Sequence, residues 1–208
     1  MTTDGRVVVL AGPSGAGKSR LAHRLHTAYG WPVVRLDDFY RDAGDPDLPI
    51  VDLGGGHRLP DWDDPRSWRA EAALQALAEL VTAGQTAVPS YDIGLSRATG
   101  TSVVTARPGD LVVAEGIFGA EIVPALATRG LLAAAFCVSQ GRWRTFVRRL
   151  ARDLRERRKP PRVLLRRGWE LARREPAIVA RAASLGAPCR HPRTAERAAA
   201  RLIASGPA

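Results

Sequence analysis

Residues 6–19 read Arg-Val-Val-Val-Leu-Ala-Gly-Pro-Ser-Gly-Ala-Gly-Lys-Ser, and this stretch decides the fold of the chain. Its first part is a short apolar, mostly β-branched run, which predicts a buried strand, and a glycine-rich loop follows directly. From Lys18 to about Tyr29 the apolar residues recur at helical spacing, so we expect a helix there. A strand, a glycine-rich loop and a helix in this order are typical of a phosphate-binding loop.

The loop has the composition that phosphate binding requires. Its glycines let successive backbone N–H groups turn toward one anion, and the helix that follows presents its positive end there. The Lys18 ammonium should reach the β- and γ-phosphates of a nucleotide, while the Ser19 hydroxyl should bind Mg²⁺. We therefore predict ATP and Mg²⁺ as cofactors. The residues expected to bind the nucleotide are Gly12, Pro13, Ser14, Gly15, Ala16, Gly17, Lys18 and Ser19.

The remainder of the chain alternates apolar strand-like runs with helical patterns. Further buried strands are predicted at residues 33–36, 111–114 and 131–138, and helices at 64–84, at 121–128 and from 141 onward. A β-hairpin is expected between residues 86–91 and 101–106, and residues 41–63 read as a surface excursion rich in Gly, Pro and Asp. This alternation predicts an α/β, three-layer P-loop NTPase fold with a mainly parallel sheet.

Composition sets limits on the class of protein. The chain has 208 residues, 45% hydrophobic and 25% charged, so we expect a single globular domain over residues 1–208. Its longest apolar run, residues 131–138, is far shorter than the roughly 20 residues that span a bilayer. The start of the chain lacks the pattern of a secretory signal, so we expect no membrane partner and a cytoplasmic location. Cys137, in an apolar strand, and Cys189, in a polar tail, read as structural thiols.

The net charge of +10 is confined to one segment. Between Arg142 and Arg167 there are eleven arginines and one lysine against Asp153 and Glu156, so the rest of the chain sums to zero. Arginines at helical spacing suit a transferring phosphoryl group, because several guanidinium groups can share its charge. A solvated helix face or a nucleic-acid patch is the alternative interpretation.

Three acidic residues follow predicted strands. Glu115 ends the run 111–114 and is a candidate second anchor for Mg²⁺, although a strand-end glutamate can simply face solvent. Asp37 and Asp38 stand at the end of the strand after the phosphate-loop helix, where a carboxylate could accept the proton of an attacking hydroxyl. The residues alone do not favour one of this pair over the other.

Together these motifs resemble the uridine kinase and phosphoribulokinase family, most closely its uridine kinase branch, over roughly residues 6–160. Asp37-Asp38-Phe39-Tyr40 resembles the family's Asp-Ser-Phe-Tyr, Trp62-Asp63-Asp64-Pro65 its Phe-Asp-His-Pro, and Pro89-Ser90-Tyr91-Asp92 its Pro-x-Tyr-Asp. The series continues with Val113-Ala114-Glu115-Gly116-Ile117 and with Arg149-x-x-Arg152-Asp153-x-x-Glu156-Arg157.

The resemblance assigns roles to particular residues. It makes Asp37 the catalytic base and places the arginines of the basic run in a helical lid at about residues 142–160, followed by a helical part at 162–208. Catalytic residues are then Asp37, Lys18, Arg149 and Arg152; acceptor-binding residues are Asp37, Tyr40, Asp63, Tyr91, Arg97 and Arg157; and metal ligands are Ser19 and Glu115. The hairpin becomes the substrate region.

One departure concerns the acceptor. Members that act on uridine and cytidine carry a histidine shortly after the tyrosine, whereas residues 91–97, Tyr-Asp-Ile-Gly-Leu-Ser-Arg, contain none. Apart from this departure, the resemblance implies an ATP-dependent kinase that transfers the γ-phosphate to a hydroxyl of a uridine- or cytidine-like nucleoside, giving the 5′-monophosphate. A kinase of the same fold acting on a pantothenate-like compound or sugar acid is the alternative, and a nucleic-acid-binding ATPase is less favoured. Assembly into a homo-oligomer stays open.

Overall fold

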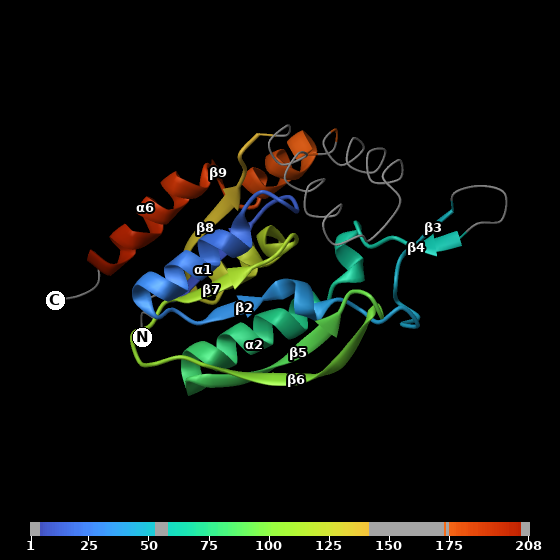
Figure 1. Ribbon diagram of the computed structural model, residues 1–208, viewed down its shortest axis with the longest axis horizontal. Coiled ribbons are helices and arrows are strands. Elements are labelled where there is room, and N and C mark those ends of the chain that lie inside the picture. Colours follow the sequence, from blue (N-terminus) through green and yellow to red (C-terminus); the bar gives the residue numbers. More distant parts are fainter. Residues whose placement is uncertain (1–4, 53–57, 142–172, 174, 205–208) are drawn as a thin grey trace.

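The computed structural model describes residues 5–52, 58–141, 173 and 175–204, and its centre is a five-stranded sheet (Figure 1). The strands lie in the order β2-β7-β1-β8-β9, and every neighbouring pair is parallel. Their bounds are Val7–Ala11 for β1, Val33–Arg35 for β2, Val112–Glu115 for β7, Leu132–Val138 for β8 and Cys189–Arg190 for β9.

The strand β1 occupies the middle of the sheet because all five of its residues are apolar and buried. The next strand along the chain, β2, does not pair with β1, since β7 lies between them. The loop after β1 therefore meets the ends of β7 and β8 at one edge of the sheet. In open parallel sheets this carboxyl edge is where ligands bind.

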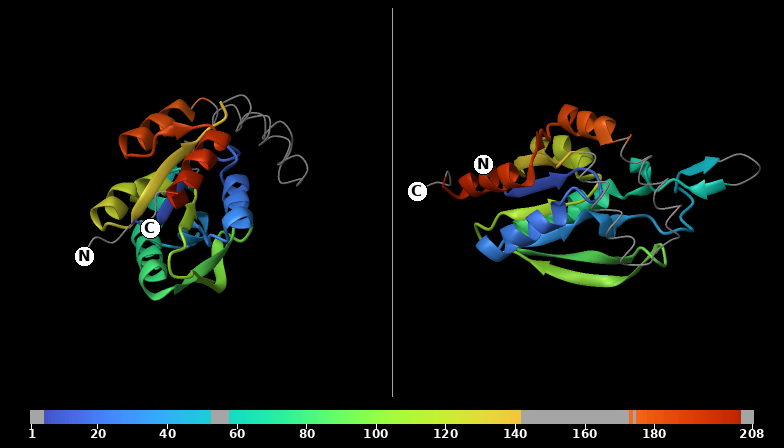
Figure 2. Two further views of the ribbon diagram at one scale, coloured as in Figure 1. Left: turned by 90° about the vertical axis from the view of Figure 1, so that its left-hand side faces the viewer. Right: turned by 45° about the horizontal axis from the view of Figure 1, so that its top comes forward.

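Helices cover both faces of the sheet (Figure 2), which confirms the predicted three-layer α/β fold. On one face α1 (Lys18–Tyr29) and α6 (Pro192–Ala204) pack through Leu21, Leu25, Ala195 and Ala199 against Val8 and Leu10. On the other face α2 (Ala70–Ala83), α3 (Val123–Thr128) and the helical residues 175–184 bury leucine, valine and alanine side chains.

Two antiparallel pairs lie outside the main sheet. The predicted hairpin is present as β5 (Gln85–Asp92) and β6 (Arg97–Thr105), with longer strands than expected, and it packs beside α2. A second pair, β3 (Ile50–Asp52) and β4 (Arg58–Pro60), projects from the body of the molecule in Figure 1. The expected surface excursion at 41–63 thus contains a small sheet of its own.

The helix predicted over 64–84 begins later than expected. Asp64 caps a short 3₁₀ turn, η2 (Pro65–Ser67), where its Oδ1 accepts the N–H of Arg66 at 2.8 Å, and α2 starts only at Ala70. Trp68 interrupts the helix because it is extended and its indole N–H donates to the carbonyl of Leu36 at 2.6 Å. A buried tertiary contact has overridden a local helix signal.

The strand predicted at 33–36 ends one residue early, at Arg35, and the chain continues as a 3₁₀ turn, η1 (Leu36–Phe39).

The tail predicted as helical over 162–208 contains the strand β9 within its described part, so Cys189 is a sheet residue and not part of a polar tail. Its register partner on β8 is Cys137, and both cysteines are free thiols. Burial raises the pKa of the Cys137 thiol to about 12. The proposed lid at 142–160 lies outside the described residues.

Within the described residues, no helix is both long and apolar enough to cross a bilayer.

Candidate functional site

The glycine-rich loop joins β1 to α1 at the carboxyl edge of the sheet. Gly12, Gly15 and Gly17 have φ angles of 125°, 84° and 99°, in the region that favours glycine. Gly12 also lies so close to the carbonyl of Val138 on β8 that an added Cβ would sit 2.5 Å from that oxygen. The Lys18 ammonium is buried and donates to the carbonyls of Gly12 and Pro13 at 2.9 and 3.1 Å. The loop is therefore closed around its own lysine.

Ser19 and Glu115 meet beside this loop. Ser19 is in the first turn of α1 and Glu115 ends β7, and the serine Oγ lies 3.2 and 3.3 Å from the two carboxylate oxygens. Glu115 is only 5% exposed, and burial raises its pKa, which the charge of Lys18 partly opposes. A buried carboxylate next to a hydroxyl suits Mg²⁺, which prefers oxygen ligands and would offset the cost of desolvation.

Asp37 lies beside this pair. Its Oδ1 accepts the backbone N–H of Ile117 at 3.0 Å, which ties η1 to the segment that follows Glu115. Gly116 allows this approach, because a Cβ there would sit 2.9 Å from the Asp37 Oδ1 and 2.7 Å from the Cβ of Leu36. Asp37 is also one of the charges that raise the pKa of Glu115, so the two carboxylates share one electrostatic environment.

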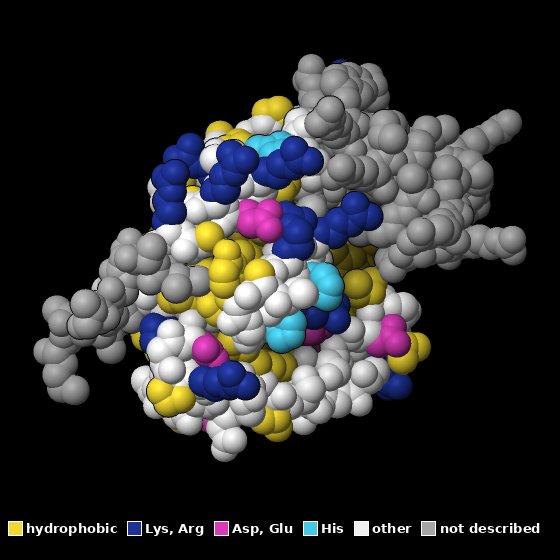
Figure 3. Space-filling model, turned by 60° about the vertical axis from the view of Figure 1, so that its left-hand side comes forward, with side chains coloured by type: hydrophobic (Ala, Val, Ile, Leu, Met, Phe, Trp, Pro, Cys, Tyr) yellow, Lys and Arg dark blue, Asp and Glu magenta, His cyan; other side chains and the backbone are white. Residues whose placement is uncertain are grey.

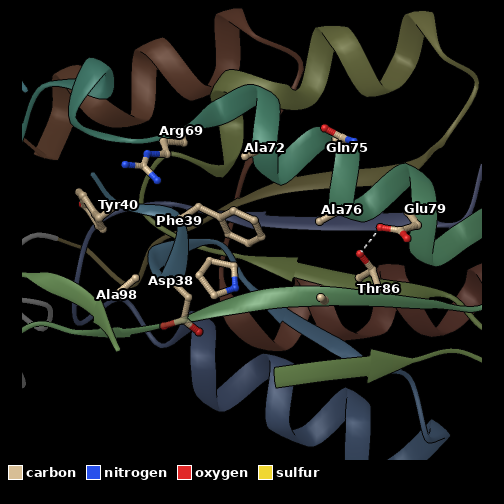
Figure 4. Close-up of a pocket in the computed structure, with 12 residues that line it drawn as sticks. Asp38, Phe39, Tyr40, Arg69, Ala72, Gln75, Ala76, Glu79, Thr86 and Ala98 are labelled. Carbon is tan, nitrogen blue, oxygen red and sulfur yellow. Dashed lines mark hydrogen bonds between the residues drawn. The ribbon is translucent and has the colours of Figure 1, made fainter. Parts of the chain in front are cut away.

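Asp38 faces a different environment. It lines a cavity of about 290 Å³ between α2 and the hairpin (Figure 4), together with Phe39, Tyr40, Arg69 and others, whereas Asp37 does not line it. Burial raises the pKa of Asp38, and its ion pair with Arg35 is long, at 3.7 Å. The two carboxylates point in different directions because successive residues of a 3₁₀ turn, with three residues per turn, are rotated by roughly 120°, although Asp38 also has a hydrogen bond from the backbone of Tyr91.

An aromatic cluster stands next to Asp37, and we define it as Tyr40, Trp62, Tyr91 and Phe118. The ring centroid of Tyr40 is 5.9 Å from each of the other three. Burial raises the pKa of Tyr40, and the charges of Asp37 and then Asp63 raise it further. Asp37, Tyr40, Asp63 and Tyr91, which the family resemblance assigns to the acceptor site, thus lie near one another.

The Tyr91 hydroxyl donates to the carbonyl of Arg41 at 3.0 Å, and burial raises the pKa of this tyrosine to about 12. This contact joins the hairpin to the segment after η1. Arg97 is exposed at the first position of β6, opposite Asp92. Arg149, Arg152 and Arg157 lie outside the described residues.

Sequence reasoning missed three residues of this region. Trp62 was quoted as part of a motif but given no role, although its place before Asp63 was a usable signal. Phe118 follows Gly116 and Ile117 and could have been found by extending that motif. Gln140 had no sequence signal, yet its side-chain amide donates to the carbonyl of Ala16 in the phosphate loop at 2.7 Å.

Positive charge also occurs outside the segment 142–167. Arg190, Arg193, Arg197 and Arg201 are exposed at the end of β9 and along α6, and Figure 3 shows Lys and Arg side chains gathered on one face. Glu196 lies among them and forms a two-bond ion pair with Arg24 of α1. The charges outside residues 142–167 sum to zero, as counted from the sequence, but the arginines named above gather around β9 and α6.

Comparison with known sequences gives two matches. The family model described as an AAA domain matches residues 7–89, from β1 into the hairpin, which is less than half of the chain. The protein described as inorganic pyrophosphatase TTM2 of Arabidopsis thaliana is 30% identical over 159 residues, or 76% of this chain. The chain spans only 21% of the length of that relative.

Comparison with solved structures concerns the fold. A protein described as a candidate fructose transport system kinase, from Silicibacter sp. TM1040, is 18% identical and superimposes over 86% of both chains with a TM-score of 0.62. A possible uridine kinase from Bacillus stearothermophilus is 22% identical, covers 57% of this chain and 64% of its own, and has a TM-score of 0.41, too low to support an inference. The chain therefore has the α/β fold of P-loop kinase-like proteins, with its loop, acids and aromatic cluster at one edge of the sheet.

Proposed function

We propose that this protein is an ATP-dependent kinase that transfers the γ-phosphate of ATP to a hydroxyl of a small molecule, and that the acceptor is a nucleoside. The observation that carries the proposal is the position of Asp37, between the Ser19–Glu115 pair on one side and the aromatic cluster on the other. A carboxylate there can accept a proton beside the metal and beside an acceptor at the same time.

Each part of the reaction has a residue suited to it. The backbone N–H groups of residues 12–19 and the Lys18 ammonium would hold the phosphates, and Ser19 and Glu115 would hold Mg²⁺, which neutralises charge on the phosphate oxygens. Asp37 would accept the hydroxyl proton as the acceptor oxygen attacks the γ-phosphorus in line and ADP leaves. Arg149 and Arg152 are proposed, from the sequence resemblance alone, to stabilise the transferring group.

The aromatic cluster supports a planar, uncharged acceptor. Rings whose centroids are 5.9 Å apart offer edges and faces against which a nucleobase can pack. Burial, and after it the charges of Asp37 and Asp63, raise the pKa of Tyr40, so two carboxylates act on this hydroxyl. A carboxylate on the acceptor would be repelled there.

The nearby described arginines do not favour an acid acceptor. Arg41 and Arg69 both donate to Asp45, at 3.2 and 2.9 Å, so their charges already have carboxylate partners. A pantothenate-like or sugar-acid acceptor would have to pair with other cations, such as Arg97 or Arg157. This comparison favours a nucleoside, bound by Tyr40, Asp63, Tyr91, Arg97 and Arg157.

The test is an acceptor screen with purified protein, ATP and Mg²⁺, read as acceptor-dependent ADP release and confirmed by mass of the product. One arm contains pyrimidine and purine nucleosides, a second contains pantothenate and sugar acids, and a third contains inorganic pyrophosphate without ATP, read as phosphate release. Turnover with a nucleoside that exceeds every other arm is expected. Turnover only in the second arm would assign an acid acceptor, and pyrophosphate hydrolysis alone would refute a kinase.

A further inference from the structure

Gln140 follows β8, the strand that neighbours β1 in the sheet, and reaches the phosphate loop through its side chain. Its Nε2 donates to the carbonyl oxygen of Ala16 at 2.7 Å. A carbonyl can only accept, so the amide must present its nitrogen and not its oxygen to this partner. The bond connects residues 124 positions apart.

Gly17 makes room for this contact. A Cβ at Gly17 would sit 2.8 Å from the Gln140 Nε2, and the φ of 99° at Gly17 is itself one that L-residues rarely adopt. The backbone conformation therefore favours glycine at this position, and a larger residue would also push the Gln140 amide away from the loop.

The bond fixes the direction of one peptide group. The carbonyl of Ala16 and the N–H of Gly17 belong to the same trans peptide and point in opposite directions. When Gln140 holds the carbonyl, the Gly17 N–H is held pointing away from Gln140. Ala16 is fully buried, and its own N–H, in the preceding peptide, donates to the carbonyl of Pro13 at 3.2 Å, so the residue that carries the held carbonyl is itself fixed in place.

Gln140 is itself attached to a rigid part of the molecule. The preceding residue, Ser139, donates its N–H to the carbonyl of Arg190 at 3.1 Å and its hydroxyl to Glu175 at 2.9 Å. Glu175 is 4% exposed, and the hydroxyl of Ser139 also accepts the N–H of Gly141 at 3.2 Å. The glutamine therefore starts from a fixed point at the edge of the sheet.

We propose that Gln140 is a positioning residue of the phosphate-binding loop, which aims the N–H of Gly17 at the bound phosphate by holding the carbonyl of Ala16. The inference about Gln140 depends on one part of the proposed function, namely that the loop binds phosphate. Gln140 does not touch the anion, and no lysine, arginine or metal is needed for its effect. Its contribution should be the same for any ligand with the same phosphate chain, whatever base it carries.

The test compares Q140M, which keeps the length and loses the donor, with Q140E, which also places a carboxylate against the Ala16 carbonyl. Affinities for ATP and for inorganic pyrophosphate are measured by calorimetry. We expect Q140M to weaken both about 2- to 12-fold, the effect of losing one neutral hydrogen bond, and Q140E to weaken both more. T128A, which removes an exposed hydroxyl bond to the carbonyl of Pro124 far from the loop, is the matched control.

Thermal unfolding separates positioning from folding. If Q140M lowers Tm more than T128A does, Q140A is used as a second variant. Wild-type affinity of a folded Q140 variant for both ligands would overturn the inference, and so would a loss confined to ATP, which would place the effect at the base. Wild-type protein that binds pyrophosphate but phosphorylates no acceptor would refute the proposed function and leave this inference standing.

Discussion

Ser19 donates a hydrogen bond to Glu115 across 96 residues of sequence, with the serine Oγ 3.2 Å from one carboxylate oxygen. The contact exists because α1 begins at the carboxyl end of β1 and β7 ends beside it, in register with Leu10. We propose this hydroxyl and buried carboxylate as the Mg²⁺ ligands beside the phosphate loop.

Replacing Glu115 tests that partner. E115Q should raise the Mg²⁺ concentration needed for half-maximal activity by at least about 10- to 100-fold, since even residues that only orient metal ligands have effects of this size. E71Q, on the exposed surface of α2, should leave it unchanged. An unchanged Mg²⁺ requirement in E115Q would remove Glu115 from the metal site.

The stability of E115Q gives a second readout with a defined sign. Burial raises the folded-state pKa of Glu115 above its ordinary value of 4.5. The folded protein therefore loses stability as the pH rises from the unfolded-state pKa to the folded-state pKa, because the buried carboxyl must then ionise. Without ligands, E115Q should therefore gain Tm relative to wild type between pH 4 and pH 8. A relative loss over this range would show that ionised Glu115 stabilises the fold.

Replacing Asp37 and Asp38 by asparagine, one at a time, tests which of them is the catalytic base. D37N should lower kcat about 100- to 10,000-fold while the Kd for ATP stays within about twofold, because only a proton acceptor is lost. D38N should have a much smaller effect on kcat, because Asp38 faces the cavity beside α2. Near-normal turnover in D37N, or equal losses in both, would contradict the assignment.

The fit at Gly116 predicts a steric effect on the same carboxylate. In G116A the new methyl group would meet the Asp37 Oδ1 and the Cβ of Leu36, so the free energy of unfolding should fall by about 1–3 kcal/mol, as overpacking does. The kcat should fall too, because Asp37 must move. G100A is the matched control, since an added Cβ there meets nothing within 4 Å. Equal behaviour of the two variants in urea unfolding would refute this account.

The hydrogen bonds to the Asp45 carboxylate predict that the stability of the fold depends on pH. A hydrogen bond from Arg69, with others from the Asp47 N–H and Arg41, lowers its pKa from 3.8 to about 2. A lowered folded-state pKa stabilises above the unfolded value, and this contribution is lost as the pH falls through about 2. D45N should therefore have a lower Tm than wild type at pH 7, with the difference shrinking from pH 4 toward pH 2.

D47N is the control for that experiment. The Asp47 side chain is 74% exposed and its ion pair with Arg41 is 3.4 Å long, while the backbone N–H that it gives to Asp45 is kept in the variant. D47N should change Tm much less than D45N at pH 7. A difference for D45N that persists unchanged at pH 2 would mean that packing, not charge, holds this segment.

The sequence by itself predicted the phosphate loop, four of the five parallel strands and the hairpin, because each rests on local patterns: β-branched runs, glycines that allow positive φ, and helical spacing. It also named Glu115 and Asp37 as acids at strand ends. These predictions needed only the rule that carboxyl ends of parallel strands meet at one edge.

Only the tertiary structure decided which surroundings each of two neighbouring residues faces. Asp37 and Asp38 looked equivalent until η1 replaced the expected strand end, and Trp68 delayed α2 because its indole bonds to Leu36. Cys189 joined the sheet beside Cys137, and Gln140 reached Ala16, through contacts between residues far apart in the chain. Such contacts depend on how the layers pack, which local propensity does not encode.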